Sequence, residues 1–555
     1  MIRLFEQHRI RNQKELEGIW DFVTEDGRKY SLTVPGCWEQ HPELINYRGK
    51  GTYTKKVYVS QKTNLRLEFK GVSHTADVYL DNVFVMHHYN AFTPFAGIIR
   101  GVQPGEHVIR VEVDNSFNEK SALHIPNDYY TYGGLTRPVV LEEIADVYIE
   151  NIHFTPKLEA DKWTGEIEVW TRNIADTTAN VDIICEFAGE HIAEKDIQIT
   201  ASTNKCIVIK HSFEKVAPWS IENPKLYMLN MQLMQDGQII DDLIERVGFR
   251  EVSWEGTRLC LNGTPVFLHG FNRHEDYGVI GCAIPPQLMM QDMNLMQDMG
   301  ANAVRTCHYP NDERFLDLCD ERGMLVWEEN HARGLDLERM QNPHFDEQCK
   351  DCIDEMITNH YNHPSIVIWG ILNECASETE EGREKYKMQY EQIKELDKTR
   401  PTTSATCRHF TDICLDLPDV VSFNMYSGWY QDVSVLERHN KEMDWIATAG
   451  GAGKPIIVSE FGAAAMYGYR DRGRSKWSEE RQADIIEENL RVYKEDDRLT
   501  GIFIWQFADC RVTEEGGWFA TRARSHNNKG VVDEYRRPKE AYDVVKQWFT
   551  NWEKK

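Results

Sequence analysis

The sequence has no run of about 18 apolar residues, the length that a helix needs to cross the hydrocarbon core of a membrane. It is also poor in positive charge, because 63 lysines and arginines stand against 89 aspartates and glutamates, a formal net charge of −26. Such a chain repels nucleic acid and acidic membrane surfaces, so we expect neither as a partner. Residues 1–13 alternate charged and apolar side chains without the apolar core of a secretory signal. We therefore expect a cytoplasmic protein.

Close cysteine pairs are almost absent. The thirteen cysteines are an odd number and are scattered, which favours free thiols in a reducing compartment over a disulfide framework. Cys349 and Cys352 alone have C-x-x-C spacing, and no second pair follows at the spacing of a zinc site. We interpret this pair as two thiols on a helix over residues 348–360. We expect no metal and no cofactor.

The length of the chain and its pattern of predicted strands and helices indicate three domains. With 555 residues, 41% of them apolar, the chain is long enough for several separate cores. Residues 1–145 read as short strands separated by turns, and residues 146–250 repeat this pattern with clear apolar alternation, so each predicts a β-sandwich. From residue 251 to residue 555 short apolar strands alternate with helical segments, which is typical of parallel βα units.

Eight candidate strands in the last 300 or so residues predict a (β/α)8 TIM barrel. In that fold, residues at the carboxyl ends of the strands and in the following loops line the active site. The candidate strands are Val266 to Asn272, Ala303 to Thr306, Leu325 to Glu328, Ile366 to Asn373, Thr403 to Thr406, Val420 to Asn424, Ile456 to Phe461 and Ile502 to Trp505.

Two glutamates, Glu374 and Glu460, each end an apolar, β-branched run. Paired carboxylates suit glycoside hydrolysis, in which one group handles protons and the other attacks the anomeric carbon. A single glutamate at a strand end is more often an exposed or ion-paired carboxylate. Their placement on two barrel strands, beside Asn373 and Phe461-Gly462, favours the catalytic interpretation.

The order of short motifs along the whole chain resembles glycoside hydrolase family 2, and within it the β-glucuronidases. Each motif is weak by itself, but this many in order is specific. The motifs are Asp128-Tyr129-Tyr130, Phe271-Asn272-Arg273-His274-Glu275-Asp276, Arg305-Thr306-Cys307-His308-Tyr309-Pro310, Asn362-His363-Pro364-Ser365, Trp369-Gly370-Ile371-Leu372-Asn373-Glu374, Asn424-Met425-Tyr426-Ser427-Gly428-Trp429-Tyr430, Val458-Ser459-Glu460-Phe461-Gly462, Trp505-Gln506-Phe507-Ala508-Asp509 and Asn527-x-Lys529-Gly530. The resemblance implies a multidomain β plus α/β protein: an N-terminal jelly-roll sugar-binding β-sandwich, an immunoglobulin-like β-sandwich and a C-terminal catalytic TIM barrel.

The resemblance also implies the catalytic roles. The glutamate of the Asn-Glu pair, Glu374, would be the acid/base, and Glu460 would be the nucleophile of a retaining enzyme. That mechanism requires the two carboxyl groups to lie about 5 to 5.5 Å apart. Asn373 would donate to the sugar 2-hydroxyl, and Tyr426 would hydrogen-bond the nucleophile and fix its orientation.

Asn527 and Lys529 predict that the sugar is acidic. Lys529 by itself would usually be a solvated surface lysine, but the Asn-x-Lys spacing stands at the family's uronate position and Gly530 follows where a loop can turn tightly. Lysine would bind the sugar carboxylate as a point charge, with Asn527 as an amide donor. A neutral hexose would leave the ammonium unpaired in a closed pocket, which is costly.

Histidines at the barrel strand ends have several interpretations. A lone histidine is usually a hydrogen-bonded core or surface group, but the resemblance makes His308 the best candidate for a contact to a substrate hydroxyl. A metal cluster of His308, His274 and His331 is a weaker alternative.

Three further substrate contacts follow from position and resemblance. Trp505, at the end of the last strand, either packs the top of the barrel or forms an apolar platform under the pyranose. Asp128 lies in the first domain, and the resemblance brings its loop to the mouth of the site. Tyr430 is a glucuronidase-like feature that keeps glucuronate among the expected substrates.

Arg333 departs from the β-glucuronidase pattern, which has small or apolar residues before the glycine where this chain reads His331-Ala332-Arg333-Gly334. One interpretation is a surface arginine paired with Glu328, Glu329 or Asp336. The other is that its fork of donors reaches the sugar and favours the axial C4 hydroxyl of galacturonate over the equatorial one of glucuronate. The segment from Asp336 to Phe345 is brief, so we expect an open aglycone side.

The leading prediction is therefore an exo-acting, retaining β-D-uronidase that hydrolyses small-molecule or oligosaccharide β-glucuronides, with β-galacturonides as an additional substrate class. A β-galacturonidase in which Arg333 selects the C4 epimer is the first alternative. A β-galactosidase acting on neutral sugars and a non-catalytic carbohydrate-binding relative are the others. We also expect a homo-oligomer.

Overall fold

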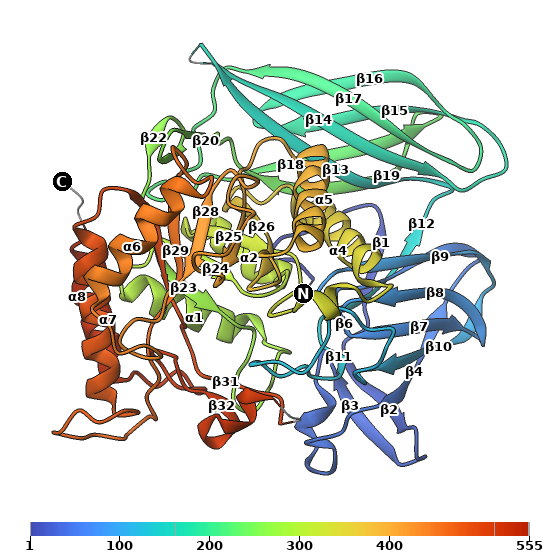
Figure 1. Cartoon of the computed structure of the whole chain (residues 1–555). Coiled ribbons are helices and arrows are strands. Elements are labelled where there is room, and N and C mark those ends of the chain that lie inside the picture. The colour runs from blue at the N-terminus through green and yellow to red at the C-terminus, as the bar shows by residue number, and fades with distance from the viewer. Residues whose placement is uncertain (1, 161, 515–516, 553–555) are drawn as a thin grey trace.

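The computed structural model describes residues 2–160, 162–514 and 517–552, and it contains two β-sandwiches and a barrel (Figure 1). Strands coloured blue to cyan form the N-terminal body, teal and green strands form the second body, and the barrel follows in the part of the chain coloured green to red. The predicted fold class is confirmed. Within these residues, no helix is long and apolar enough to cross a membrane.

The N-terminal sandwich consists of two antiparallel sheets around a core rich in aromatic side chains. Trp20, Phe22, Trp38 and Tyr53 are each at most 1% exposed in this core. One sheet has the order β1 (Asn12–Glu15), β12 (Val139–Ile144), β5 (Thr63–Phe69) and β9 (Phe95–Val102); the other has the order β3 (Lys29–Val34), β2 (Gly18–Thr24), β4 (Lys50–Val59), β10 (Gly105–Asp114), β7 (Thr75–Leu80) and β8 (Val83–Tyr89), and a small third sheet pairs β11 (Gly134–Leu135) with β6 (Val72–Ser73).

The second sandwich has alternating buried and exposed residues along its strands, as expected of a sheet with one face against a core. The first sheet has the order β13 (Val147–Glu159), β14 (Lys162–Asn173) and β17 (Thr203–Phe213), and the second has the order β16 (Glu190–Ile199), β15 (Ala179–Phe187), β18 (Tyr227–Gln235) and β19 (Gln238–Val247). Trp219 lies in the connection between β17 and β18. It is fully buried and packs against apolar residues of the barrel strands, which joins the two bodies.

Eight parallel strands close the barrel, and each overlaps one of the segments predicted from the sequence. Their order around the barrel is β23 (Leu268–Arg273), β24 (Ala303–Thr306), β25 (Leu325–Glu329), β26 (Ile366–Asn373), β27 (Thr402–Thr406), β28 (Val421–Asn424), β29 (Ile456–Phe461) and β30 (Leu499–Ile504). A small sheet of β20 (Val252–Glu255), β21 (Arg258–Leu261) and β22 (Thr264–Pro265) precedes them, and a two-stranded ribbon of β31 (Cys510–Arg511) and β32 (His526–Asn527) follows.

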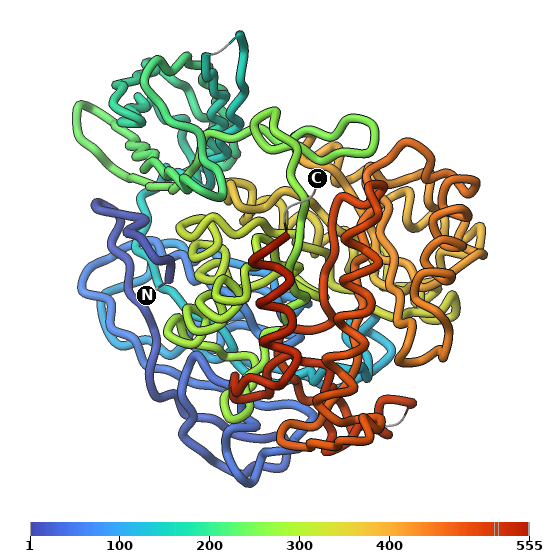
Figure 2. The backbone as a smooth tube through the Cα atoms, turned by 90° about the vertical axis from the view of Figure 1, so that its left-hand side faces the viewer, coloured from blue at the N-terminus to red at the C-terminus, as the bar shows by residue number. Residues whose placement is uncertain are grey.

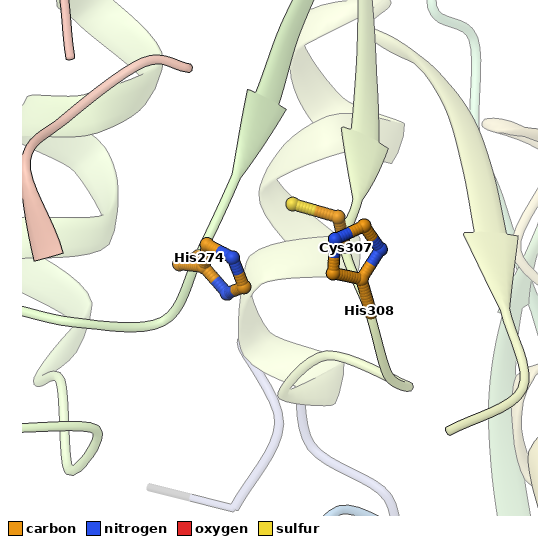
Figure 3. Close-up of side chains that lie close together, drawn as sticks. All are labelled: His274, Cys307 and His308. Carbon is orange, nitrogen blue, oxygen red and sulfur yellow. The ribbon is translucent and has the colours of Figure 1, made fainter. Parts of the chain in front are cut away.

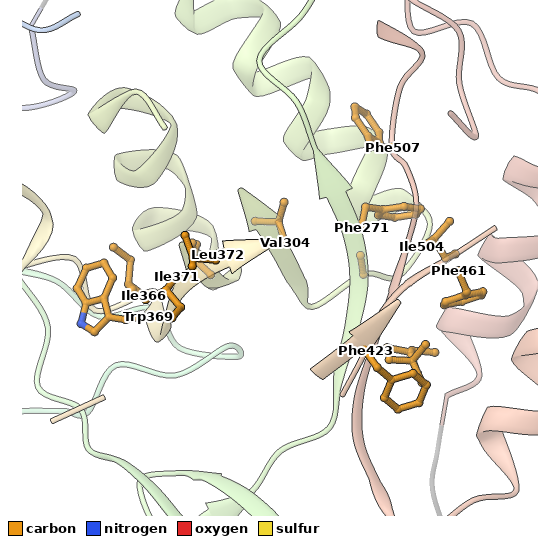
Figure 4. Packing of buried hydrophobic residues seen from close by; sticks show 14 of the residues in the cluster. Phe271, Val304, Ile366, Trp369, Ile371, Leu372, Phe423, Phe461, Ile504 and Phe507 are labelled. Atoms are coloured by element: carbon orange, nitrogen blue, oxygen red, sulfur yellow. The ribbon is translucent and has the colours of Figure 1, made fainter. Parts of the chain in front are cut away.

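The barrel core has two parts because alternate strand residues face the helices and the barrel interior. Phe271, Val304 and Phe423 belong to the larger part, which also contains residues of the surrounding helices (Figure 4). Trp327 and Phe503 belong to the smaller part, composed largely of residues from the barrel strands.

Helices surround the barrel, and most begin at a side-chain cap. The hydroxyl of Ser434 accepts from the Glu437 amide at the start of α6, and Ser478 does the same for α7. The helices are α1 (Pro286–Asp298), α2 (Glu313–Arg322), α3 (Leu337–Met340), α4 (Phe345–His360), α5 (Glu380–Leu396), α6 (Val435–Thr448), α7 (Glu479–Lys494) and α8 (Glu540–Thr550). Cys349 and Cys352 lie buried on α4, in agreement with the predicted helix. Figure 2 shows α8, in dark red, running along the outside of the barrel.

The N-terminal sandwich is held against the barrel by buried ion pairs and hydrogen bonds. Arg137 Nη2 donates to Glu275 Oε2 at 2.7 Å, and the Tyr132 hydroxyl donates to Asp276 Oδ2 at 2.9 Å. These contacts place the loop that carries Asp128 over the carboxyl ends of the barrel strands. The first sandwich therefore contributes a side chain to the barrel's cavity.

Candidate active site

A cavity of about 380 Å³ lies at the carboxyl ends of the barrel strands. Both predicted carboxylates reach it: Glu460 is the second-last residue of the strand β29, and Glu374 follows β26 directly. The cavity lining includes, of the predicted site residues, Asp128, Arg333, Glu374, Tyr426, Tyr430, Glu460, Trp505 and Lys529. Asn373, His308 and Asn527 lie directly behind this lining and are fully or almost fully buried.

Glu460 is held by one cation and one hydroxyl. Arg305 Nη1 donates to its Oε1 at 2.9 Å, and the Tyr426 hydroxyl donates to its Oε2 at 2.6 Å. Burial and the nearby charge of Glu374 raise the pKa of Glu460 to about 7, while Arg305 and Tyr426 act in the opposite direction. The two donors fix the orientation of both carboxylate oxygens.

Arg305 itself is a buried hub, with no exposed side-chain surface. Its Nε and Nη2 donate to the two oxygens of Glu329, each at 2.9 Å, in a bidentate pair. Its remaining donors reach Asn272 Oδ1 and Asn373 Oδ1, each at 2.9 Å. One guanidinium thus contacts side chains from four other barrel strands, and one of these side chains is the predicted nucleophile.

Glu374 sits in a strained backbone conformation, with a φ of 55°. A residue other than glycine in this left-handed region costs roughly 1–3 kcal/mol, and such residues cluster at functional sites. Asn424 Nδ2 donates to its Oε1 at 2.9 Å, and Arg333 Nη2 donates to its Oε2 at 3.3 Å. The carboxyl group of Glu374 lines the cavity and accepts hydrogen bonds from a neutral amide and from a charged guanidinium.

Arg333 is part of the site and is not a surface residue. Its side chain is 13% exposed, and its Nη1 donates to Asn127 Oδ1 at 2.9 Å. Its partners are therefore Asn127 and Glu374, not Glu328, Glu329 or Asp336. Burial disfavours its charge, but Glu374 and Asp128 outweigh burial and raise the pKa of the guanidinium, so it stays charged.

Lys529 lies in a positive corner of the cavity and is 1% exposed. Its Nζ donates to the Tyr430 hydroxyl at 2.8 Å and lies over the ring of Tyr426, 5.5 Å from its centroid. Among the described residues, no carboxylate oxygen lies within 4.0 Å of this ammonium. Burial lowers the pKa of Lys529; burial opposes ionisation of Tyr430, but the charges of Lys529 and Arg522 prevail and lower its pKa.

Arg522, which the sequence interpretation missed, is the second cation of this corner. Its Nε and Nη2 donate to Asp128 at 3.0 and 2.7 Å, and Nη2 also reaches the Tyr430 hydroxyl at 3.1 Å. Asn527 Nδ2 donates to Asp128 Oδ2 at 2.9 Å, so this amide positions Asp128. Asp128 thus orients Arg522, and Tyr430 joins the two cations.

Gly530 allows the loop after Lys529 to approach the barrel closely. A Cβ at this position would lie 2.3 Å from both the Asp509 nitrogen and the Val532 oxygen. Its amide donates to Asp509 Oδ1 at 2.8 Å. The glycine is required here by space, and its backbone does not adopt a positive φ.

Figure 3 shows His274 at the end of one barrel strand and Cys307 and His308 at the end of the next. One donor atom from each of these three side chains lies within 4.8 Å of the others, so they could in principle hold a metal ion. Arg305 Nη2 lies 3.3 Å from His308 Nδ1, and this charge opposes a cation there. Burial lowers the pKa of His274 to about 3 and that of His308 well below its usual range, so both rings are neutral.

Each of the two neutral imidazole rings has one ring nitrogen that is not hydrogen-bonded to the described residues. His308 Nδ1 is 2.7 Å from Glu329 Oε1, while His308 Nε2 and His274 Nε2 are buried with no hydrogen-bond partner in the described parts of the chain. The ring of Trp505 stacks on His308 with centroids 5.0 Å apart. His331 instead bonds the hydroxyl of Tyr129 at 3.1 Å, away from this pair.

The comparisons with known proteins agree on one family. The model for the TIM barrel domain of glycosyl hydrolases family 2 matches residues 252–553, and a second model of glycosyl hydrolases family 2 matches residues 147–250. A crystal structure of a β-galacturonidase of that family from Eisenbergiella tayi, bound to galacturonate, is 48% identical, has a TM-score of 0.97 and covers 100% of both chains.

More distant relatives also align over nearly the whole chain. A β-glucuronidase from Streptococcus agalactiae is 28% identical over 98% of this chain and 96% of its own. A structure of a β-glucuronidase from Ruminococcus gnavus in complex with D-glucaro-d-lactam is 25% identical, has a TM-score of 0.88 and covers 100% of this chain and 99% of that one.

The raised pKa of Glu460 predicts how kcat/KM falls on the acid side of its pH profile. A nucleophilic carboxylate must be ionised, so kcat/KM should fall by about tenfold per pH unit below a midpoint near pH 7. Tyr426→Phe removes a hydrogen bond that lowers this pKa, so the midpoint should move to higher pH. Tyr430→Phe is the matched control, because that hydroxyl donates no bond to Glu460. A midpoint near pH 4.5, or a shift to lower pH in Tyr426→Phe, contradicts the assignment.

Proposed function

The chain belongs to glycosyl hydrolase family 2, and from that premise we propose that it is an exo-acting β-uronidase that works with retention of configuration. The observation that carries the proposal is the buried ammonium of Lys529, which has no carboxylate partner among the described residues. Leaving such a charge unpaired is costly. A carboxylate on the sugar supplies the missing partner, with Arg522 beside it.

The reaction follows from the positions of the two glutamates. An oxygen of Glu460 forms a bond to the anomeric carbon as the bond to the leaving oxygen breaks, and Glu374 gives its proton to that oxygen. Glu374 then takes a proton from water, and the water oxygen displaces Glu460 from the same carbon. Arg305 and Tyr426 hold Glu460 in its charged, aligned form before the attack.

Asn373 is placed for the contact to the sugar 2-hydroxyl. Its Oδ1 accepts from Arg305 at 2.9 Å and from Asn424 at 3.3 Å, which fixes the orientation of the amide. Its Nδ2 is buried and has no hydrogen-bond partner in the part of the chain that the structure describes. A donor to the 2-hydroxyl strengthens as the transition state gains oxocarbenium character.

Galacturonides are the proposed substrates within this class. Two observations support them: the galacturonate-bound relative is 48% identical, and the guanidinium of Arg333 lines the cavity beside Glu374. Glucuronides are the second candidate, favoured by the β-glucuronidases at 25–28% identity and by Tyr430 in the positive corner.

We also propose that the protein works as a homo-oligomer in the cytoplasm. All thirteen cysteines are free thiols, and most are buried, which suits a reducing compartment.

Lys529→Met should separate uronides from neutral sugars. We expect kcat/KM for an aryl β-galacturonide to fall by about 100-fold or more, because a charge-assisted contact to the reacting sugar is worth about 2 to 4 kcal/mol. Turnover of the matching aryl β-galactoside should change little. Steady-state kinetics on both substrates provide the test, with the thermal unfolding midpoint as a check of folding. An equal loss on both substrates would assign Lys529 to stability instead.

Arg333→Ala should change the preference between C4 epimers. We expect kcat/KM for the aryl β-galacturonide to fall by about tenfold to 100-fold, while that for the β-glucuronide is unchanged or higher. Losing a cation beside Glu374 affects both epimers alike, so the ratio of the two values isolates the contact to C4. Arg333→Lys keeps the charge without the fork and is the matched control. A ratio within about twofold of the wild-type value rules out this role.

A further inference from the structure

Part of the cavity lining, which we call the second arm, comes from the segments that follow β27 and β28. Cys407 and His409 follow β27, and Gln431 and Arg438 come from the loop after β28 and the first turns of α6. The strand β27 is paired with β26, which carries Glu374 at its end. Lys529 and Arg522, by contrast, follow β30. Because Glu374 protonates the leaving oxygen in the proposed reaction, this arm receives the leaving group.

Arg438 supplies the guanidinium group of the second arm. Its side chain is 13% exposed, and its Nη2 lies 3.4 Å from Glu442 Oε2. The same Glu442 carboxylate accepts from His409 through Nδ1 at 2.7 Å, so one buried acid is shared by two basic side chains. Arg438 Nε is buried and has no hydrogen-bond partner within the described residues.

Phe410 provides the apolar surface on which this guanidinium stacks. It follows His409, is 47% exposed and has a φ of 64°, a left-handed conformation that is uncommon for an aromatic residue. Its ring lies under the Arg438 guanidinium, 4.7 Å from the centroid, and packs edge-on against Trp445 at 5.5 Å. The stacking holds the guanidinium in one orientation, which reduces the entropy that a ligand must overcome.

Three kinds of leaving group would meet this arm differently. A cationic one is repelled by Arg438. A neutral one gives the Arg438 guanidinium no anionic partner. A carboxylate can accept from the part of this guanidinium that lines the cavity, in a charge-assisted hydrogen bond.

We propose that this arm is a leaving-group subsite for acidic aglycones, either a carboxylate-bearing phenol or a second sugar acid, bound by Arg438. The inference rests on the proposed uronidase function and extends it, because it adds a second carboxylate to the substrate. The positive corner would hold the acid of the departing uronosyl residue, and Arg438 would hold the acid of the group that leaves.

A matched pair of substrates tests the subsite without altering the protein. The β-galacturonides of 3-hydroxybenzoate and of its methyl ester differ in one charge at the distal carboxyl group. We expect wild type to prefer the free acid in kcat/KM by about tenfold, the size of one well-placed charged hydrogen bond. A wild type that hydrolyses the ester but shows no preference for the free acid excludes an aromatic acid as the ligand, and the inference is overturned if the disaccharide pair described below shows no preference either. A wild type that hydrolyses neither refutes the proposed function itself.

Arg438→Met tests the residue, because the ratio between variants cancels any intrinsic difference in reactivity. We expect the preference for the free acid to fall to within about twofold of unity, with ester hydrolysis kept within about threefold of wild type. Arg408→Met is the matched control: Arg408 pairs with Glu378 at 3.2 Å and does not line the cavity, so the preference should persist. If Arg438→Met keeps the full preference, Arg438 does not bind the leaving group.

A second pair identifies the source of the acid. Disaccharides with a β-galacturonosyl residue on galacturonate or on galactose are compared by release of the terminal sugar. A preference for the acid that is confined to the aryl pair assigns the subsite to an aromatic acid, and one that is confined to the disaccharides assigns it to a sugar acid. Either preference must be lost in Arg438→Met. Absence of both in wild type contradicts the inference.

Discussion

The buried guanidinium of Arg305 is the interaction on which the site depends. It donates to Glu460 and to Glu329, and it also holds the side-chain oxygens of Asn272 and Asn373. A charge with no exposed surface is tolerable only when it is fully paired. Here the pairing groups come from four different barrel strands, so a single cation positions both the proposed nucleophile, Glu460, and the proposed donor to the sugar 2-hydroxyl, Asn373.

Charge in this protein is organised locally. The chain as a whole is strongly acidic, with a formal net charge of −26, yet the cavity brings together Lys529, Arg522 and Arg333. Asp128 pairs with Arg522, whereas the ammonium of Lys529 has no carboxylate partner among the described residues and can pair with a ligand. An anion is therefore attracted by the cavity and not by the surface, which suits a small acidic substrate.

The barrel and the two glutamates that line its cavity were predictable because their signals are local. Apolar runs ended by Asn373-Glu374 and by Glu460 mark strand ends, and strand ends mark the active face of a barrel. Arg305 lies inside a strand motif, where an inward-facing charge was a usable signal that the prediction overlooked. Arg522 and Arg438 were out of reach, since one lies in an irregular loop and the other on an ordinary helix turn. Their positions in the cavity depend on tertiary contacts, which the spacing of residues along the sequence does not predict.

The stereochemistry of the first product tests the central claim, that Arg305 and Tyr426 hold Glu460 as a nucleophile, most directly. Proton NMR of an aryl β-galacturonide during the first minutes of hydrolysis distinguishes the two anomers of the released sugar before they equilibrate. A covalent intermediate on Glu460 gives two displacements at the anomeric carbon, so the β anomer should appear first. If the α anomer appears first, Glu460 does not attack the sugar and the account is wrong.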